Sequence, residues 1–220
     1  MYKMILTICF LLPINHAIAT EDKNATETKD AASSSIDLEA LKSLQKDLSG
    51  FTYLSLDYTN TRSKKIRNKT TTSKGKAYFS KPNFFRWIKT ESEVIYNGES
   101  FFQYSPEDKA AVQFNISQGD GKQIHQLMNL FLNFNELQNL YEIKEFKNGP
   151  EIAELKLVPK IKIEDLRHVD VKIDTKNKHL MSIRMQMRDT FSSFEFSNHN
   201  HEKIAEGAFA LPKGTKINKF

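Results

Sequence analysis

Short segments in which apolar and polar residues alternate are the feature that most constrains the fold of this chain. Alternation with a period of two predicts strands with one buried face. Asn97-Gly98 lies between two such segments and is a strong signal for a tight hairpin, so neighbouring strands are expected to pair antiparallel. Residues 62–73 are polar, with a threonine run suited to an exposed strand. The predicted strands are residues 52–58, 75–80, 84–90, 93–96, 100–104 and 111–116, then 152–158, 169–173, 181–187 and 191–197.

Two segments have helical spacing instead. Leucines recur over residues 38–48, where Ser35 and Asp37 are candidate N-caps and Gly50 is a stop signal. A wider apolar stripe covers residues 122–141. Two helices cannot cover both faces of a sheet of about ten strands. We therefore predict a mainly β (α+β) fold, an incomplete antiparallel β-barrel, or half-barrel, with a helical lid over a hydrophobic cavity.

The residue pattern of the first 35 positions predicts that the protein is exported. Residues 1–19 contain Lys3, an apolar run and the pattern Ala17-Ile18-Ala19, which is typical of a signal peptide cleaved after Ala19; an uncleaved anchor is the alternative. Residues 20–35 are small and polar and predict a flexible linker, so the folded domain is expected over residues 36–220. Cys9, the only cysteine, lies in the apolar run, and neither lipidation nor a disulfide is expected.

No residue pattern points to catalysis. The chain lacks G-x-S-x-G and a phosphate-binding glycine loop, and a hydrolase using an unrecognised carboxylate pair is the remaining enzymatic alternative. His199 and His201 beside Glu202 suggest at most a weak metal site. The basic cluster at residues 62–67 is better explained as a solvated hairpin end than as a nucleic-acid patch. We expect no enzyme activity, no cofactor and no nucleic-acid partner.

Apolar surface is what the chain has in excess. It contains 16 Phe, 7 Tyr and 1 Trp, although an ordinary core is the simpler explanation for any single one of them. Methionines at residues 181, 185 and 187 suit an adaptable wall. The residues predicted to line a lipid-binding cavity and its lid are Leu54, Leu56, Tyr58, Tyr78, Phe85, Trp87, Phe102, Tyr104, Leu127, Phe131 and Ile183.

Several motifs in order resemble the LolA family of outer-membrane lipoprotein carriers. Residues 75–87 (GKAYFSKPNFFRW) are similar to its segment with a basic residue, proline and F-x-W, and residues 94–106 (VIYNGESFFQYSP) to its next hairpin. Leu157-Val158-Pro159-Lys160, Asp189 and the closing F-x-x-P-x-G at residues 209–214 follow in the same order. The resemblance covers residues 37–216.

The resemblance implies a periplasmic, monomeric carrier. It implies that acylated lipoproteins are taken from an inner-membrane ABC transporter complex and delivered to an outer-membrane lipoprotein acceptor. Family members use an arginine before the proline to hold the lid, whereas this chain has Lys81 there; Arg86 is the alternative, although alternation places it opposite Phe85 and Trp87. A related half-barrel that senses or transfers other lipids or glycolipids is the second hypothesis.

Overall fold

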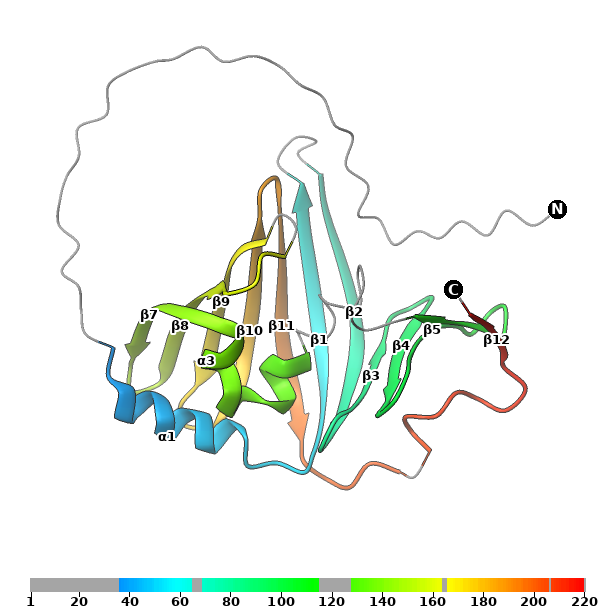
Figure 1. Cartoon of the computed structure of the whole chain (residues 1–220), viewed down its shortest axis with the longest axis horizontal. Helices are drawn as coiled ribbons and strands as arrows, with labels where there is room; N and C mark the ends of the chain where they lie inside the picture. The colour runs from blue at the N-terminus through cyan, green and yellow to red at the C-terminus, as the bar shows by residue number, and fades with distance from the viewer. Residues whose placement is uncertain (1–35, 65–68, 115–127, 164–165, 206, 220) are drawn as a thin grey trace, which may run out of the picture. The chain divides into compact units, whose positions relative to one another are not determined.

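A single twisted sheet forms the body of the protein. The computed structural model describes residues 36–64, 69–114, 128–163, 166–205 and 207–219, so the predicted signal peptide, the predicted linker and Leu127 lie outside the described residues. Within these ranges, twelve strands lie in the order β12-β6-β5-β4-β3-β2-β1-β11-β10-β9-β8-β7 (Figure 1). All neighbours pair antiparallel except β12 and β6, which are parallel. The strands are β1 Tyr53–Lys64, β2 Lys69–Ser80, β3 Phe84–Ile88, β4 Glu93–Asn97, β5 Phe101–Ser105, β6 Ala110–Phe114, β7 Tyr141–Asn148, β8 Ile152–Pro159, β9 Leu166–Asp174, β10 His179–Met187, β11 Thr190–Asn200 and β12 Lys216–Lys219.

The first helix forms as predicted. Helix α1 spans Leu38–Leu48, and the Asp37 carboxylate accepts a hydrogen bond from the Ala40 amide at 3.0 Å. Such a cap satisfies one of the amides that a helix start leaves unpaired. Leu41, Leu44 and Leu48 are buried in the same cluster as the inward side chains of the sheet. The helix therefore covers one face of the sheet.

The prediction of one continuous helix over residues 122–141 is wrong. Residues 128–132 are helical, a 3-10 turn η1 follows at Phe134–Glu136, and α3 is only Leu137–Leu140. Tyr141 already begins β7 and is buried. Residues 122–127 lie outside the described residues. We call α1, residues 128–132, η1 and α3 the lid, and Figure 1 shows its helices in front of the β7–β11 part of the sheet.

Two strands differ from their predicted form. Residues 69–80 make one strand, β2, whose polar first half is exposed and pairs with the polar end of β1. In β10 the register shifts between Leu180 and Ser182, which inserts one residue. Leu180 and Ile183 are both buried, so Met181 leaves the predicted apolar row and borders the polar outer face.

The sheet stays open, and the predicted half-barrel fold class is confirmed. The edge strands β7 and β12 do not meet.

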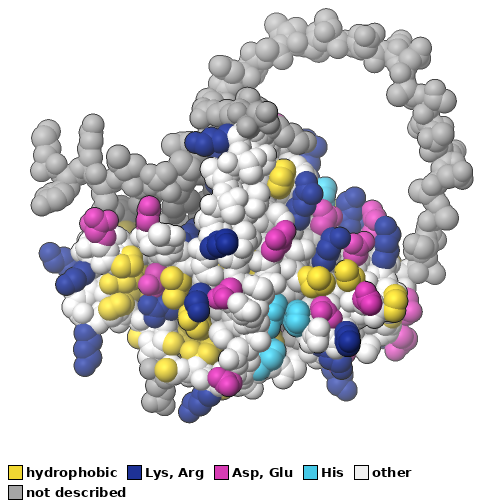
Figure 2. All heavy atoms as spheres, turned by 180° about the vertical axis from the view of Figure 1, so that it is seen from behind, with side chains coloured by type: hydrophobic (Ala, Val, Ile, Leu, Met, Phe, Trp, Pro, Cys, Tyr) yellow, Lys and Arg dark blue, Asp and Glu magenta, His cyan; other side chains and the backbone are white. Residues whose placement is uncertain are grey.

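A separate small cluster of Ile95, Phe102, Tyr104 and Ala111 lies on the other face of β4–β6 with Leu211. Figure 2 shows hydrophobic side chains in several patches of the rear face, with the larger ones at the left of the view. In the described ranges, no helix has both the length and the apolar character needed to cross a membrane.

Candidate binding cavity

An apolar cavity of about 200 Å³ lies between the lid and the middle of the sheet. Its walls come from β1, β2, β3, β4, β10 and β11, and residues 128–132 close it from the lid side. Sequence alternation on each strand puts every second side chain toward this space. The lining residues are Tyr58, Asn60, Ser73, Phe85, Trp87, Lys89, Val94, Met128, Phe131, Ile183, Phe194 and Phe196.

Tyr58 contributes a ring to the cavity and turns its hydroxyl into the wall. The Tyr58 hydroxyl donates a hydrogen bond to the Ile88 carbonyl at 2.9 Å, and burial raises the pKa of Tyr58 to about 12. Its ring lies 4.3 Å, centroid to centroid, from that of Trp87. Gly75 is opposite Tyr58 in the β1–β2 register, and only a residue without a side chain leaves room for this arrangement. The cavity therefore keeps an apolar wall at Tyr58.

Aromatic contacts join the lid to the sheet. The Phe131 ring stacks on Phe79 at 4.4 Å and meets Phe196 edge-on at 5.1 Å. Phe194 meets Trp87 edge-on at 5.5 Å. Rings in these geometries attract one another beyond the effect of burial alone. One buried lid side chain thus closes the cavity by packing, without a polar contact.

The rim of the cavity is polar and basic. The Asn60 amide donates a hydrogen bond to the Ser192 hydroxyl at 2.8 Å. Ser73 in β2 lies opposite Asn60 in the β1–β2 register. Lys89, two residues after Trp87, is the one charged residue among the lining residues. Desolvation, and then the nearby charge of Arg62, lower the pKa of the Lys89 ammonium. The cavity therefore has a mainly apolar lining together with the polar side chains of Asn60, Ser73 and Lys89.

Lys81, and not Arg86, contacts the lid. The Lys81 ammonium donates a hydrogen bond to the Ser49 carbonyl at the end of α1, and it lies 5.3 Å from the centroid of the Phe51 ring. Arg86 lies on the opposite face, where it pairs with Glu93 at 2.5 Å and donates to the Ala208 carbonyl at 2.7 Å. Lysine thus makes a lid contact from the position where the family arginine was expected.

Lys81→Gln is expected to loosen the end of α1. Loss of a charge-assisted hydrogen bond should lower the free energy of unfolding by about 1–2 kcal/mol and speed amide exchange at residues 45–50. Lys178→Gln is the matched control. The Lys178 ammonium also contacts α1, through an ion pair of 3.1 Å with the Asp47 carboxylate, but 56% of its side chain is exposed. An exposed pair contributes about 0.5 kcal/mol or less. Equal effects of the two substitutions in urea unfolding and hydrogen exchange contradict the assignment.

The structure gathers five of the predicted site residues around the cavity. These are Tyr58, Phe85, Trp87, Phe131 and Ile183. Leu54 and Leu56 face the same side but pack in the core, with Leu54 beside Leu48 and Phe131 at the edge of the lid. Leu127 lies outside the described residues.

Three predicted residues face away from the cavity, which corrects their placement. Tyr78 is paired with Arg86, on the face opposite Phe79 and Phe85, and Phe102 and Tyr104 belong to the small cluster with Leu211. Phe101 turns to the main core instead. Alternation favours the row of Phe102 and Tyr104, because the row of Phe101 continues with Gln103 and Ser105, but the second cluster buries that apolar row on the other face of the sheet.

Sequence reasoning missed Phe194, Phe196, Val94 and the polar rim as cavity residues. The alternation in residues 191–197 does place the two phenylalanines together, and their rings are parallel at 6.4 Å. However, no local signal shows that β11 pairs with β1, more than 120 residues away. No sequence pattern marks Lys89 as a cavity residue, because a lone lysine after a strand is ordinarily a surface residue.

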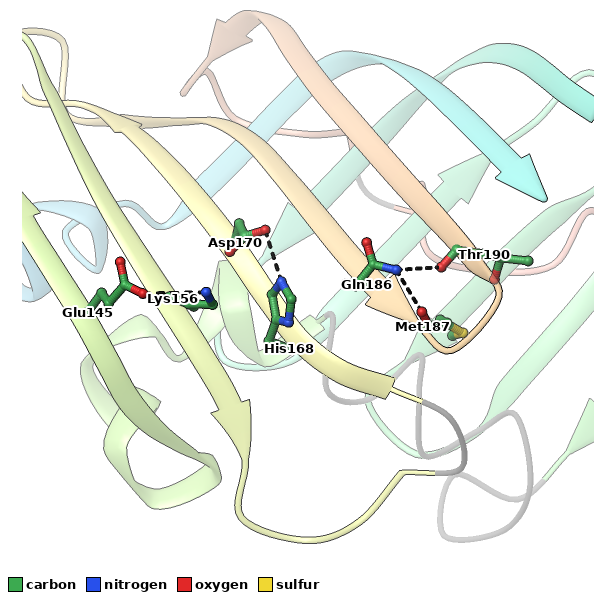
Figure 3. A network of polar contacts seen from close by, with 7 residues as sticks. All are labelled: Glu145, Lys156, His168, Asp170, Gln186, Met187 and Thr190. Atoms are coloured by element: carbon green, nitrogen blue, oxygen red, sulfur yellow. Dashed lines mark hydrogen bonds and ion pairs between the residues drawn. The ribbon is translucent and has the colours of Figure 1, made fainter. Parts of the chain in front are cut away.

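The outer face of β7–β10 has the character of a solvated surface. Figure 3 shows Lys156 beside Glu145, His168 beside Asp170, and the Gln186 amide donating to the carbonyls of Met187 and Thr190. Opposite charges on neighbouring strands stabilise a sheet modestly. The hollow on this face, about 730 Å³, is lined by many charged side chains, whereas the cavity on the lid side is lined mainly by aromatic and aliphatic ones.

Histidines cluster at the far end of β10 and β11. The rings of His179 and His199 stack at 4.0 Å, and the Nδ1 atom of His201 lies 3.1 Å from the Tyr53 carbonyl. Figure 2 shows several histidine side chains gathered on the rear face. Among the residues that the structure describes, no three His, Cys, Asp or Glu side chains are arranged to hold a metal ion. Chelation by His199 and His201 thus has no geometric support.

The protein should lose stability in mild acid through His199. Desolvation, and then the neighbouring His179, lower the pKa of His199 to about 4, from 6.5, and its Nε2 atom is buried without a hydrogen-bond partner in the described part of the chain. The unfolded chain therefore binds the extra proton first, and stability falls as the pH drops from about 6.5 to 4. We expect a loss of about 2 kcal/mol from this group. Urea unfolding at pH 7 and pH 4.5 should show a smaller loss for His199→Phe; equal losses contradict the assignment.

The sequence matches a known family over most of its length. Residues 49–212 match the profile of the family described as outer membrane lipoprotein carrier protein, LolA. This range contains every residue that lines the cavity. No curated protein sequence matches the chain.

Solved structures with a similar backbone share little sequence with this chain. An uncharacterized conserved protein from Thermus thermophilus is 12% identical, with 83% of this chain and 98% of that chain covered and a TM-score of 0.49. A LolA superfamily protein from Nitrosomonas europaea is 8% identical, with 79% and 96% covered and a TM-score of 0.44. The lipoprotein LppX from Mycobacterium tuberculosis is 12% identical, with 77% and 98% covered and a TM-score of 0.39.

Proposed function

The chain belongs to the LolA family of outer membrane lipoprotein carrier proteins, and from this we infer that it carries acylated lipoproteins by sheltering their acyl chains in the cavity under the lid. The cavity is the observation that carries this function. Its floor is built from aromatic and aliphatic side chains, and the hydroxyl of Tyr58, one of these residues, is hydrogen-bonded into the wall. Each buried methylene of a ligand contributes about 0.8 kcal/mol, so acyl chains need no specific polar partner.

The size of the cavity implies that loading moves the lid. A cavity of about 150 Å³ holds a benzene-sized group, and this one, at about 200 Å³, has room for the end of one acyl chain. A larger acyl load requires the Phe131 segment to separate from Phe79 and Phe196. Lys81 ties the end of α1 to the end of β2, and the bond from the Gln45 amide to the Phe134 carbonyl, 3.1 Å long, joins α1 to η1 within the lid. Opening therefore breaks a small number of defined contacts.

The remaining parts of the function rest on the family. We propose that the chain is exported to the periplasm after cleavage behind Ala19, acts as a monomer, receives cargo from an inner-membrane ABC transporter complex and passes it to an outer-membrane acceptor. No chemical step is needed for such a cycle. The protein is thus proposed to be a carrier and not an enzyme.

Release of lipoproteins from membranes tests the proposal. Purified protein lacking residues 1–19 is added to spheroplasts or to vesicles that contain the transporter, and triacylated lipoprotein is measured in the supernatant. A soluble complex of carrier and lipoprotein is the expected result. Lipoprotein that stays in the membrane, while an established carrier releases it in parallel, contradicts the proposal.

A further inference from the structure

The two edges of the sheet end differently. At one edge, β7 contacts helices α1 and α3 of the lid, and its register shift interrupts the regular row of backbone groups. At the other edge, on the right in Figure 1, β12 pairs with β6, and no further strand lies beyond it in the described ranges. All four residues of β12 are exposed. The β12 edge is therefore the one that is open to pairing with a further strand.

The backbone of β12 presents hydrogen-bonding groups on its open side. The Lys216 amide donates a hydrogen bond to the Lys109 carbonyl at 3.0 Å, toward β6. Because the amide and carbonyl groups of consecutive residues in a strand point to opposite sides, those of Ile217 and Lys219 point away from β6. An extended peptide pairs with such groups as an added strand. An acyl chain has no groups that pair with them.

An apolar hollow of about 410 Å³ adjoins this edge, on the face of the sheet away from the lid. Ile217, which is 49% exposed, forms part of its wall. Phe84 and Phe102 line it from the sheet, residues 207–211 line it from the C-terminal segment, and Asn97 is its one polar lining side chain. The larger hydrophobic patches of Figure 2 lie at the left of the view, on the side where β12 lies. The hollow thus offers a seat for a large apolar side chain beside β12.

Positive charge flanks β12. Lys213, Lys216 and Lys219 are exposed, and in the described ranges none of them forms an ion pair. The carboxylates closest along the chain to β6 are those of Glu107 and Asp108, in the turn before that strand. Lysines at a sheet edge oppose pairing between two copies of the same edge, whereas they attract a segment of opposite charge. The charges therefore favour an acidic partner over a second copy of this chain.

We propose that β12 and the hollow beside it bind an extended, acidic segment of a partner protein. The segment pairs with β12 as an added strand and places a large apolar side chain in the hollow. In this mode of recognition the main-chain hydrogen bonds contribute affinity, and the pocket for alternate side chains contributes specificity. The site lies on the face away from the lid, so it is separate from the cavity on which the proposed function rests.

A fluorescently labelled hexapeptide of alternating glutamate and leucine tests the proposal. In a strand its leucines share one face and its glutamates the other. Fluorescence anisotropy with the purified protein measures binding at low peptide concentration. We expect this peptide to bind roughly tenfold more tightly at low salt than a hexapeptide of alternating lysine and leucine, with the difference shrinking as salt screens the charges. Equal binding of the two peptides, or no binding of the glutamate peptide, overturns the proposal.

Variants locate the peptide on β12. Ile217→Asn should weaken binding of the glutamate peptide about fivefold or more, whereas Ile152→Asn, at a position 39% exposed on β8, should not. Ile217→Pro removes the amide on the open side, where a sheet edge tolerates proline, and should weaken binding as well. Lys216→Glu should shift the preference to the lysine peptide, and Lys147→Glu, the same change of charge on β7, should leave it unchanged. Thermal melts verify that each variant is folded.

The two sites are tested independently. Equal effects within either matched pair of variants overturn the β12 site. Full affinity in Ile217→Pro, or displacement of the peptide by decanol, shows a hollow that binds apolar groups without strand pairing and also overturns it. Trp87 is the only tryptophan of the chain and lines the cavity under the lid, so its fluorescence reports decanol there. Absence of that signal in the unmodified protein contradicts the lid cavity and leaves the β12 site intact.

Discussion

Replacing Gly75 with alanine is expected to destabilise the protein by about 3 kcal/mol or more. A Cβ atom at Gly75 would lie 2.0 Å from the Ile88 carbonyl oxygen and 2.5 Å from the Tyr58 hydroxyl oxygen. The first of these is backbone in the neighbouring strand and cannot rotate away. Overpacking in a well-packed region typically costs about 1–3 kcal/mol, and sometimes more. Urea unfolding at pH 7 measures the effect.

Gly50→Ala is the control for this substitution. A Cβ atom there meets its nearest neighbour, the Asp47 carbonyl oxygen, at 3.4 Å, which is an ordinary contact, so a change below about 0.5 kcal/mol is expected. Combining Gly75→Ala with Tyr58→Phe removes the clash of the new Cβ atom with the Tyr58 hydroxyl but keeps its clash with the Ile88 carbonyl oxygen. The double variant should therefore stay destabilised. A Gly75→Ala protein as stable as the original contradicts the close packing of β1, β2 and β3 at the cavity wall.

Replacing Phe194 with asparagine should weaken binding of an alkyl ligand by about tenfold to a hundredfold. Phe194 lines the cavity and contacts Trp87 and Phe196. The substitution removes apolar surface and puts an unpaired amide against the ligand, and an unsatisfied polar group costs about 1–3 kcal/mol in proteins. Asparagine is neutral, so it does not pair with the Lys89 ammonium as an acid would. Trp87 fluorescence with decanol measures the loss, and release of lipoprotein should fall in parallel.

Phe191→Asn provides a control on the same strand. Phe191 pairs with Gln186 and packs against Arg184, with the guanidinium 4.4 Å from the ring centroid on the outer face. This variant should bind decanol as the original protein does. Equal weakening by both substitutions would indicate a general loosening of β11, and an unchanged affinity in Phe194→Asn contradicts the cavity as the binding site.

Most strands were predictable because each depends on local alternation and turn residues. Asn97-Gly98 forms its hairpin with Gly98 at φ 92°, and the Asp37 cap and the end of α1 near Gly50 follow from side chains within four residues. Strand β7 was missed because its apolar residues Tyr141, Ile143 and Phe146 are out of step, owing to a register shift between Ile143 and Glu145. Its first residue also continued the helical spacing of the preceding segment.

The site was only half predictable. Tyr58 lies on β1, and Phe85 and Trp87 lie on β3, the two strands that flank β2, so alternation along consecutive antiparallel strands brings them to one face. Phe194, Lys89 and the Lys81 contact with Ser49 depend on pairings or packing between distant segments. Phe102 was misplaced because a second apolar cluster with Leu211 buries its row on the other face, and Tyr78 was misplaced because it shares its row with Lys76, opposite the row of Ala77 and Phe79.

The sequence by itself determined the strands, the first helix, the excess of apolar side chains and the motif order that identifies the family. These follow from short-range periodicity and turn chemistry, which neighbouring residues decide. Only the tertiary structure decided which apolar row faces the lid, where the lid helix breaks, and that Lys89 and Phe194 line one cavity. The physical reason is that a sheet brings residues together through strand order and register. Here the pairing of β1 with β11 and a one-residue bulge in β10 select the faces, and neither leaves a trace in any short stretch of sequence.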